Sequence, residues 1–174
     1  MSAFSMPQTI ATPRLMLTQW RADHFEVVAA YNADAQSTRY TGGVLSREDA
    51  WRGLAEMIGH WALRGFGLYA VEEPSGALIG GVGLYFPEGW PALELGFDLM
   101  PPARGKGYAT EAAAAVRDRA AANGLTELSS LIHPENRASI AVAERLGAVH
   151  DGMLDVRGVP HRHYRHAMQR KRAA

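Results

Sequence analysis

The sequence predicts a mixed α/β domain, in which a twisted mixed sheet of about seven strands carries helices on both faces. Three observations lead to this prediction. The chain has 174 residues, the usual size of one domain. Its 47% of hydrophobic residues are enough for a core. Short apolar runs alternate with segments of helical period, in the order β-α-α-β-β-β-α-β-α-β-β.

The first half of the chain is predicted to place two helices ahead of a β-hairpin. Asp23 and Ser46 can each cap a helix N-terminus, and each precedes apolar residues near helical spacing. A turn sequence at residues 74–76 separates two apolar runs, which predicts the hairpin. The predicted elements are a strand at 15–17, helices beginning at Asp23 and Ser46, and strands at 68–72 and 78–85.

The second half is predicted to alternate strands with two further helices. Residues 100–104 form a tight connection with two prolines, and an alanine-rich helix follows it. Gly124 and Gly147 are expected to end the two helices, because glycine readily adopts the left-handed conformation found there. The predicted elements are strands at 93–99, 128–132, 151–156 and 161–168, and helices at 107–122 and 136–146.

Composition limits the classes of function. Lys and Arg number 18, as do Asp and Glu, so net charge favours neither a nucleic acid nor a membrane as a partner. The absence of cysteine excludes disulfides, thiolate metal sites and a cysteine nucleophile. No signal-peptide pattern or membrane span is present, so we expect a cytoplasmic protein. We expect a lead-in at 1–11, one domain at 12–168 and a basic solvated tail at 169–174.

Residues 104–110 have the features of a diphosphate-binding site. A strand stops, a glycine-bearing loop turns, and a helix begins whose first amides lack intrahelical partners. Gly105 and Gly107 let a phosphate approach those amides, and the flanking basic residues add positive charge. Gly107 stands where the nucleoside triphosphatase loop requires Ser or Thr, and Thr110 stands where the dinucleotide motif requires glycine. Glycines that merely turn the chain remain an alternative.

The same segment carries a resemblance to a known family. Residues 104–109, Arg-Gly-Lys-Gly-Tyr-Ala, match the phosphate motif of the GNAT N-acetyltransferase superfamily, and the chain resembles this family from about Thr12 to Met168. Asn136-Arg-Ala-Ser139 is similar to the opening of the family's second cofactor-contacting helix. Thr-Pro-Arg-Leu at 12–15 resembles the subgroup of ribosomal-protein N-terminal acetyltransferases, the RimJ/RimL-like enzymes.

The resemblance implies binding of acetyl-CoA in a V-shaped splay between strands 93–99 and 128–132. It also implies direct attack of a primary amine on the thioester, with the α-amine of a protein N-terminus or a small-molecule amine as acceptor. A backbone amide near Leu99 is the implied donor to the thioester oxygen. The residues that the resemblance assigns to acetyl-CoA are Leu99, Met100, Arg104, Gly105, Lys106, Gly107, Tyr108, Ala109, Thr110, Asn136 and Ser139.

Glu94 is the expected general base, acting directly or through a water, and Asp98 on the same strand face is a second candidate. A structural carboxylate paired across the sheet is the alternative for Glu94. Many family members place a tyrosine acid where this chain has Ala143. We therefore expect Ser139 either to hydrogen-bond the leaving thiolate or only to contact the cofactor. Glu111 is expected in the first turn of the helix at 107–122, where the helix dipole alone favours an acidic residue.

The acceptor is expected to contact Glu94 and Tyr40, which lies in the loop between the first two helices. His161 and His163 share a strand face, but no nearby carboxylate completes a ligand set, so no metal site is expected. They are expected on the acceptor side of the cleft or on a solvated edge. A non-catalytic acyl-CoA sensor remains an alternative function, which the missing tyrosine favours. The sequence leaves a monomer and a homodimer equally open.

Overall fold

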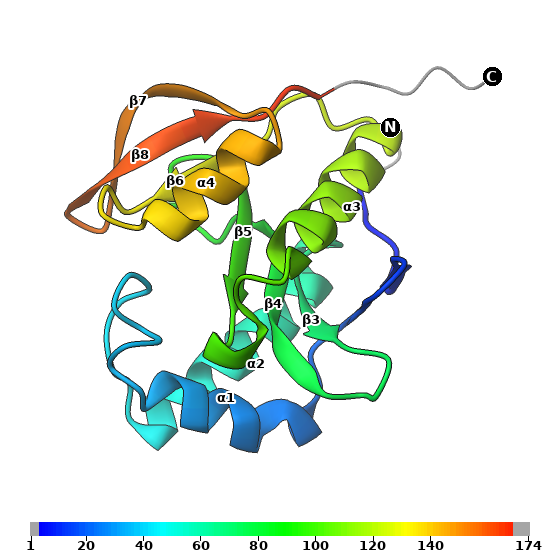
Figure 1. Cartoon of the computed structure of the whole chain (residues 1–174), viewed down its shortest axis with the longest axis vertical. Helices are drawn as coiled ribbons and strands as arrows, with labels where there is room; N and C mark the ends of the chain where they lie inside the picture. Colours follow the sequence, from blue (N-terminus) through cyan, green and yellow to red (C-terminus); the bar gives the residue numbers. More distant parts are fainter. Residues whose placement is uncertain (1–3, 169–174) are drawn as a thin grey trace.

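Eight strands form one mixed sheet through the whole molecule (Figure 1). The computed structural model describes residues 4–168, so the expected basic tail lies outside the described residues. In space the strand order is β1-β2-β3-β4-β5-β6-β8-β7, and β5 with β6 is the parallel pair. The bounds are β1 Ile10–Ala11, β2 Met16–Thr18, β3 Leu68–Glu72, β4 Leu78–Tyr85, β5 Glu94–Leu99, β6 Ser129–Ile132, β7 Val149–Val156 and β8 Val159–Arg165.

Helices cover both faces of this sheet, as predicted. Val28 of α1 and Leu54 of α2 pack with Ala70 of β3. Val116 of α3 packs in a separate cluster with Val71, whose side chain points to the opposite face of β3. None of the helices within residues 4–168 is long and apolar enough to span a membrane. The helical bounds are α1 Phe25–Asn32, α2 Arg47–Arg64, α3 Tyr108–Ala122 and α4 Arg137–Arg145, with the 3-10 helices η1 Ala22–His24 and η2 Pro101–Ala103.

Local side-chain chemistry explains where the helices begin, with one correction. Ser46 accepts a hydrogen bond from the Asp49 amide at 3.1 Å, so it caps α2 as predicted. The prediction that Asp23 caps the first helix, α1, is wrong. Asp23 lies inside η1, and α1 begins at Phe25 without a side-chain cap. The Arg21 amide instead donates to Nδ1 of His24 at 3.3 Å, a pairing that helix-cap patterns do not anticipate.

The eighth strand comes from the segment expected to be a lead-in. Residues Ile10 and Ala11 pair with Leu17 and Met16 as the edge strand β1. A strand of two residues has no visible alternation, so it exists only because β2 offers a free edge. The count of about seven strands was therefore one short, and the class of fold is confirmed.

Strands β5 and β6 diverge almost from their start. They pair at a single position, Glu94 with Ser129, whereas β4 and β5 pair at six positions. One step further, the Ser130 hydroxyl donates to the Leu95 carbonyl at 2.7 Å, in place of a backbone bond. The V-shaped splay expected from the sequence is thus present, and it opens toward the carboxyl ends of both strands.

Candidate active site

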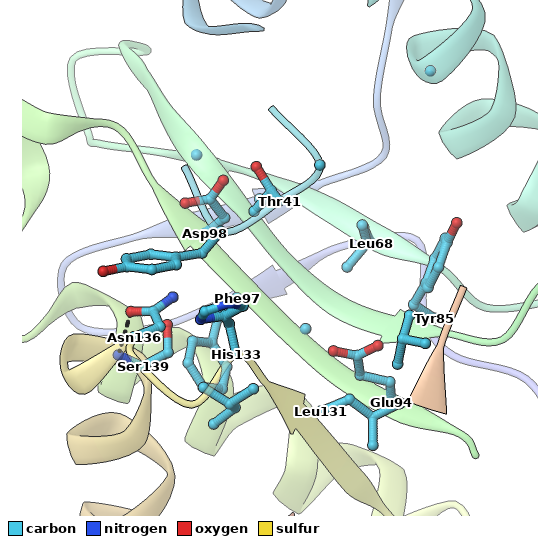
Figure 2. Close-up of a pocket in the computed structure, with 18 of the residues that line it drawn as sticks. Thr41, Leu68, Tyr85, Glu94, Phe97, Asp98, Leu131, His133, Asn136 and Ser139 are labelled. Atoms are coloured by element: carbon cyan, nitrogen blue, oxygen red, sulfur yellow. Dashed lines mark hydrogen bonds between the residues drawn. The ribbon is translucent and has the colours of Figure 1, made fainter. Parts of the chain in front are cut away.

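A cavity of about 880 Å³ opens in the V between β5 and β6 (Figure 2). It is bounded by these two strands, by the loop at 39–43 and by the turn between β7 and β8. Its size is typical of a ligand-binding cleft. The predicted site residues that line it are Tyr40, Glu94, Asp98, Met100, Asn136, Ser139 and His161.

The edge of β5 that faces the cavity carries unpaired backbone groups. In the antiparallel ladder with β4, alternate residues of β5 bond to β4. The Met100 amide donates to the Ile79 carbonyl at 2.8 Å, which fixes the even-numbered residues on the β4 side. Phe97 and Leu99 therefore direct their amides away from β4, toward the V.

Met100 has no free backbone group at the end of this edge. Its carbonyl accepts from the Ala103 amide at 2.9 Å, in addition to the bond from its own amide. The Leu99 carbonyl is also occupied, because Nε of Arg104 donates to it at 2.7 Å. The Leu99 amide points away from β4, but it hydrogen-bonds the Asp98 carboxylate. The free donor along this edge is consequently the Phe97 amide, which was missed because the alternation depends on register with β4.

The glycine loop forms the N-terminus of α3, outside the cavity itself. Gly105 and Gly107 have φ of 77° and 81°, in the left-handed region that disfavours other residues. A side chain at Gly105 would meet nothing within 4 Å, so the loop backbone is open to solvent. The first turn of α3 then presents the amides of Tyr108, Ala109 and Thr110 at the positive end of its dipole.

Glu111 holds the N-terminal segment against this loop. Its carboxylate accepts from the Thr12 hydroxyl at 2.6 Å and from Nε of Arg14 at 2.6 Å. Nη1 of Arg14 donates to the Lys106 carbonyl at 2.9 Å. Burial raises the pKa of Glu111, but the hydrogen bonds from Thr12 and Arg14 outweigh it and leave that pKa below its ordinary value. Glu111 is therefore a structural clamp.

Glu94 is the ionisable group best suited to proton transfer in the cavity. Burial raises its pKa to about 7, although the Trp90 indole and the Leu131 amide stabilise the charged form. The Trp90 Nε1 donates to the carboxylate at 2.8 Å. Figure 2 shows Glu94 on the same side of the cavity as Tyr85. A carboxylate with this pKa is about half ionised at neutral pH, as a general base should be.

Asp98 lies on the same face of β5, but other residues occupy its carboxylate. The Tyr31 hydroxyl donates to it, and Nη2 of Arg104 lies 3.7 Å from it. Burial raises the pKa of Asp98 despite both partners. The arrangement ties α1 and the start of the glycine loop to β5, which is a structural role.

The opposite wall of the V is the start of α4. Oδ1 of Asn136 accepts from the Ser139 amide at 3.2 Å and caps the helix (Figure 2). Ser139 lines the cavity one turn into the helix. Ala143, at the position of the family's tyrosine, is fully buried with Ile132 and Tyr164. Ser139 is thus the hydroxyl that this helix offers to the cavity.

Aromatic and imidazole rings lie together on the wall of the cavity formed by the loop at 39–43 and its neighbours. The Tyr40 ring lies 5.1 Å from the His133 ring, and the His161 ring lies 6.0 Å from His133. His163 does not line the cavity; its Nε2 lies 2.7 Å from the Ser129 hydroxyl. Within residues 4–168, no group of histidine and acidic side chains is arranged to hold a metal ion. Sequence reasoning missed the cavity residues Tyr31, Glu56, Tyr85, Trp90 and Arg157, which carry no motif or periodicity.

The geometry defines an acyltransferase-like cleft, with a splayed parallel pair, a free strand edge and a glycine loop opening a helix. Residues 14–149 match the family described as the acetyltransferase (GNAT) domain. This span is most of the chain, which therefore belongs to the GNAT acetyltransferase family. Members of this family use acetyl-CoA as the acetyl donor.

Individual relatives agree with this assignment. The uncharacterized N-acetyltransferase YnaD of Bacillus subtilis (strain 168) is 28% identical over 147 residues, which are 83% of this chain and 85% of YnaD. The crystal structure of an acetyltransferase from Agrobacterium tumefaciens str. C58 is 31% identical, with a TM-score of 0.84 over 94% of this chain and 95% of that chain. RimL, the ribosomal L7/L12 alpha-N-protein acetyltransferase, in complex with coenzyme A, has a TM-score of 0.75 at 16% identity, over 95% of this chain and 99% of RimL, and so shares the fold.

Proposed function

We propose that this chain is an acetyl-CoA-dependent N-acetyltransferase that acts on a primary amine, with residues 12–168 as the catalytic domain. The observation that carries the proposal is the unpaired edge of β5, which leads from the cavity toward the glycine loop. A ligand with an amide-bearing arm and a diphosphate matches both features, and acetyl-CoA has both. The coenzyme A bound to RimL, a protein of the same fold, supports this choice.

The cofactor has a place for each of its parts. Its pantetheine arm would lie along the edge of β5 between Phe97 and the glycine loop, in the position of an extra strand. The diphosphate would lie against the amides at 105–110, where Lys106 adds an exposed positive charge. Asn136 and Ser139 would face the arm from the other wall. Acetyl-CoA supplies an acetyl group activated as a thioester.

Different groups of the cavity would perform the separate steps of acetyl transfer. Glu94 would take the proton from the attacking amine as its nitrogen bonds to the acetyl carbon and the carbon–sulfur bond breaks. The Phe97 amide, the free donor of the β5 edge on the Glu94 side of Leu99, would donate to the carbonyl oxygen as charge develops on it. The sulfur would receive a proton from the Ser139 hydroxyl or from water, and a thiol pKa of about 8.5 makes this an easy step. The acceptor would enter past Tyr40.

The first test combines binding with turnover. The thermal unfolding midpoint is measured with acetyl-CoA, coenzyme A, NAD and ATP, and we expect acetyl-CoA and coenzyme A alone to raise it. Acetyl transfer to a panel of amines is then followed as released thiol. The chain contains no cysteine, so a thiol reagent detects only coenzyme A.

Each outcome of this test has a distinct meaning. A raised midpoint with thiol release confirms the proposal. A raised midpoint without turnover on any amine would favour the acyl-CoA sensor, which the alanine at position 143 also favours. If neither acetyl-CoA nor coenzyme A raises the unfolding midpoint of a folded sample, the proposed cofactor site is wrong.

A further inference from the structure

The β7–β8 hairpin places an arginine at the mouth of the cavity. Val156 pairs with Val159, so the turn consists of Arg157 and Gly158. Both have positive φ, 52° and 83°, which is the tight turn that favours Asn-Gly. Within residues 4–168, Arg157 is the one non-glycine residue with positive φ. A long charged side chain at this position is unfavourable for the turn itself, and such exceptions concentrate at functional sites.

The turn lies on the cavity, and its arginine stacks on a residue that contacts the base. Val156, Arg157 and Val159 all line the cavity. The guanidinium lies over the Trp90 ring, 5.5 Å from its centroid. The edge of the same indole donates to Glu94. One aromatic ring therefore separates the expected proton acceptor from a positive charge.

Of the two arginines that line the cavity, Arg39 has a counter-charge, and Arg157 has none among residues 4–168. Asp98 is bonded by Tyr31, Glu56 accepts from the Tyr85 hydroxyl at 2.5 Å, and Arg39 lies 3.5 Å from Glu135. Arg157, in contrast, forms no ion pair with any carboxylate of the described chain. The planar guanidinium of Arg157 can donate two hydrogen bonds to a carboxylate, and its positive charge repels the second ammonium group of a diamine.

We propose that Arg157 binds a carboxylate of the acceptor, so that the substrates are amines that also carry a carboxylate. The amine would face Glu94, and the carboxylate would reach Arg157 across Trp90. This inference rests on the proposed function and names its substrate class. Free amino acids and peptides with an acidic residue near the N-terminus both offer this chemistry, whereas a simple diamine does not.

The test compares each acceptor with its uncharged partner. Free amino acids are paired with their carboxamides, and amidated peptides with an early Asp or Glu are paired with their Asn or Gln counterparts. The measured quantity is the ratio of kcat/KM for the acid to that for the amide. Comparing this ratio between variants cancels the intrinsic reactivity of each amine. The pair with the larger ratio identifies the source of the carboxylate.

Three variants separate charge from fold. Arg157→Asn removes the charge and suits the turn, so it should fold, and we expect the ratio to fall by about tenfold or more. Arg157→Lys should keep part of the preference. Arg165→Gln is the matched control on the same hairpin, because Arg165 is 64% exposed, pairs with Asp151 and lies outside the cavity. It should leave the ratio unchanged.

The results distinguish this inference from the function beneath it. An unchanged ratio in Arg157→Asn, or a wild-type chain that acetylates only the amides, overturns the role of Arg157 and leaves the acetyltransferase proposal intact. A wild-type chain that acetylates a simple diamine but neither member of any pair also overturns only this inference. A chain that binds acetyl-CoA but acetylates no amine of the panel and no member of any pair contradicts the proposed function, and this inference with it.

Discussion

At the scale of single residues, Glu94 and Asp98 show how environment separates two carboxylates of one strand. Both lie on the same face of β5, and burial raises the pKa of each. Asp98 is bonded by Tyr31 and faces Arg104, so its oxygens are occupied. Glu94 accepts from two neutral donors, the Trp90 indole and the Leu131 amide, so its carboxylate is not paired with a positive charge. Glu94 is therefore the carboxylate that we propose for proton transfer.

This assignment predicts a pH-dependent rate. The raised pKa means that Glu94 is protonated below about pH 7, so kcat/KM should rise with pH through about 7. Glu94→Gln should lower kcat by about 100-fold or more and remove this rise. Rates are measured between about pH 5.5 and 9, with an acceptor whose amine titrates below this range. A wild-type profile in Glu94→Gln would assign the proton transfer to another group.

At the scale of elements, the glycine loop and β5 act as one unit. The loop leaves the end of β5 through η2, and Arg104 bonds back to the Leu99 carbonyl. This bond holds the first residue of the loop against β5, the strand along which we propose that the pantetheine arm lies. The free amides of α3 and the free edge of β5 are consequently fixed relative to each other.

Gly105→Val should weaken coenzyme A binding by at least about tenfold, because a side chain on the loop blocks the approach of phosphate to the amides. Gly76→Val is the matched control. Gly76 also has positive φ, 83°, and open space around it, but it lies in the β3–β4 turn away from the cavity. Both variants should lose about 1–2 kcal/mol of stability from the strained φ. Equal affinity in the two variants, measured by calorimetry, would move the diphosphate elsewhere.

At the scale of the whole molecule, the N-terminal segment closes over the start of α3. Thr12 and Arg14 reach Glu111 across almost 100 positions of sequence, at 2.6 Å each. Arg14 also donates a hydrogen bond to the Lys106 carbonyl. The cofactor loop is therefore supported by a part of the chain that the sequence showed only as a strand and its approach.

Glu111→Gln should lower the free energy of unfolding by about 1–2 kcal/mol at pH 7. The folded-state pKa of Glu111 is below its ordinary value of 4.5, so its contribution is complete above that value and is lost as the pH falls through the folded-state pKa. The difference between wild type and variant, measured by urea unfolding, should thus shrink as the pH falls below 4.5. A constant difference from pH 7 to 3 would mean that the charge of Glu111 contributes nothing.

The sequence by itself determined what depends on neighbours along the chain. The order of the elements, the cap at Ser46 and the helix ends at Gly124 and Gly147 follow from short-range backbone preferences. The glycine loop before α3 was predicted on the same ground, since its amides are free in any helix start. The resemblance to the GNAT family added the prediction of the V-shaped splay between the two strands.

The tertiary structure decided everything that depends on partners distant in sequence. The two-residue β1 exists through β2, and the register of β5 with β4 decides that Phe97 rather than Met100 has a free amide. Trp90 and Arg157 meet only after the hairpin of β7 and β8 folds back over the cleft. Hydrogen-bond pairing, burial and pKa are properties of surroundings, and the surroundings of a residue are set by segments that the local pattern around it does not contain.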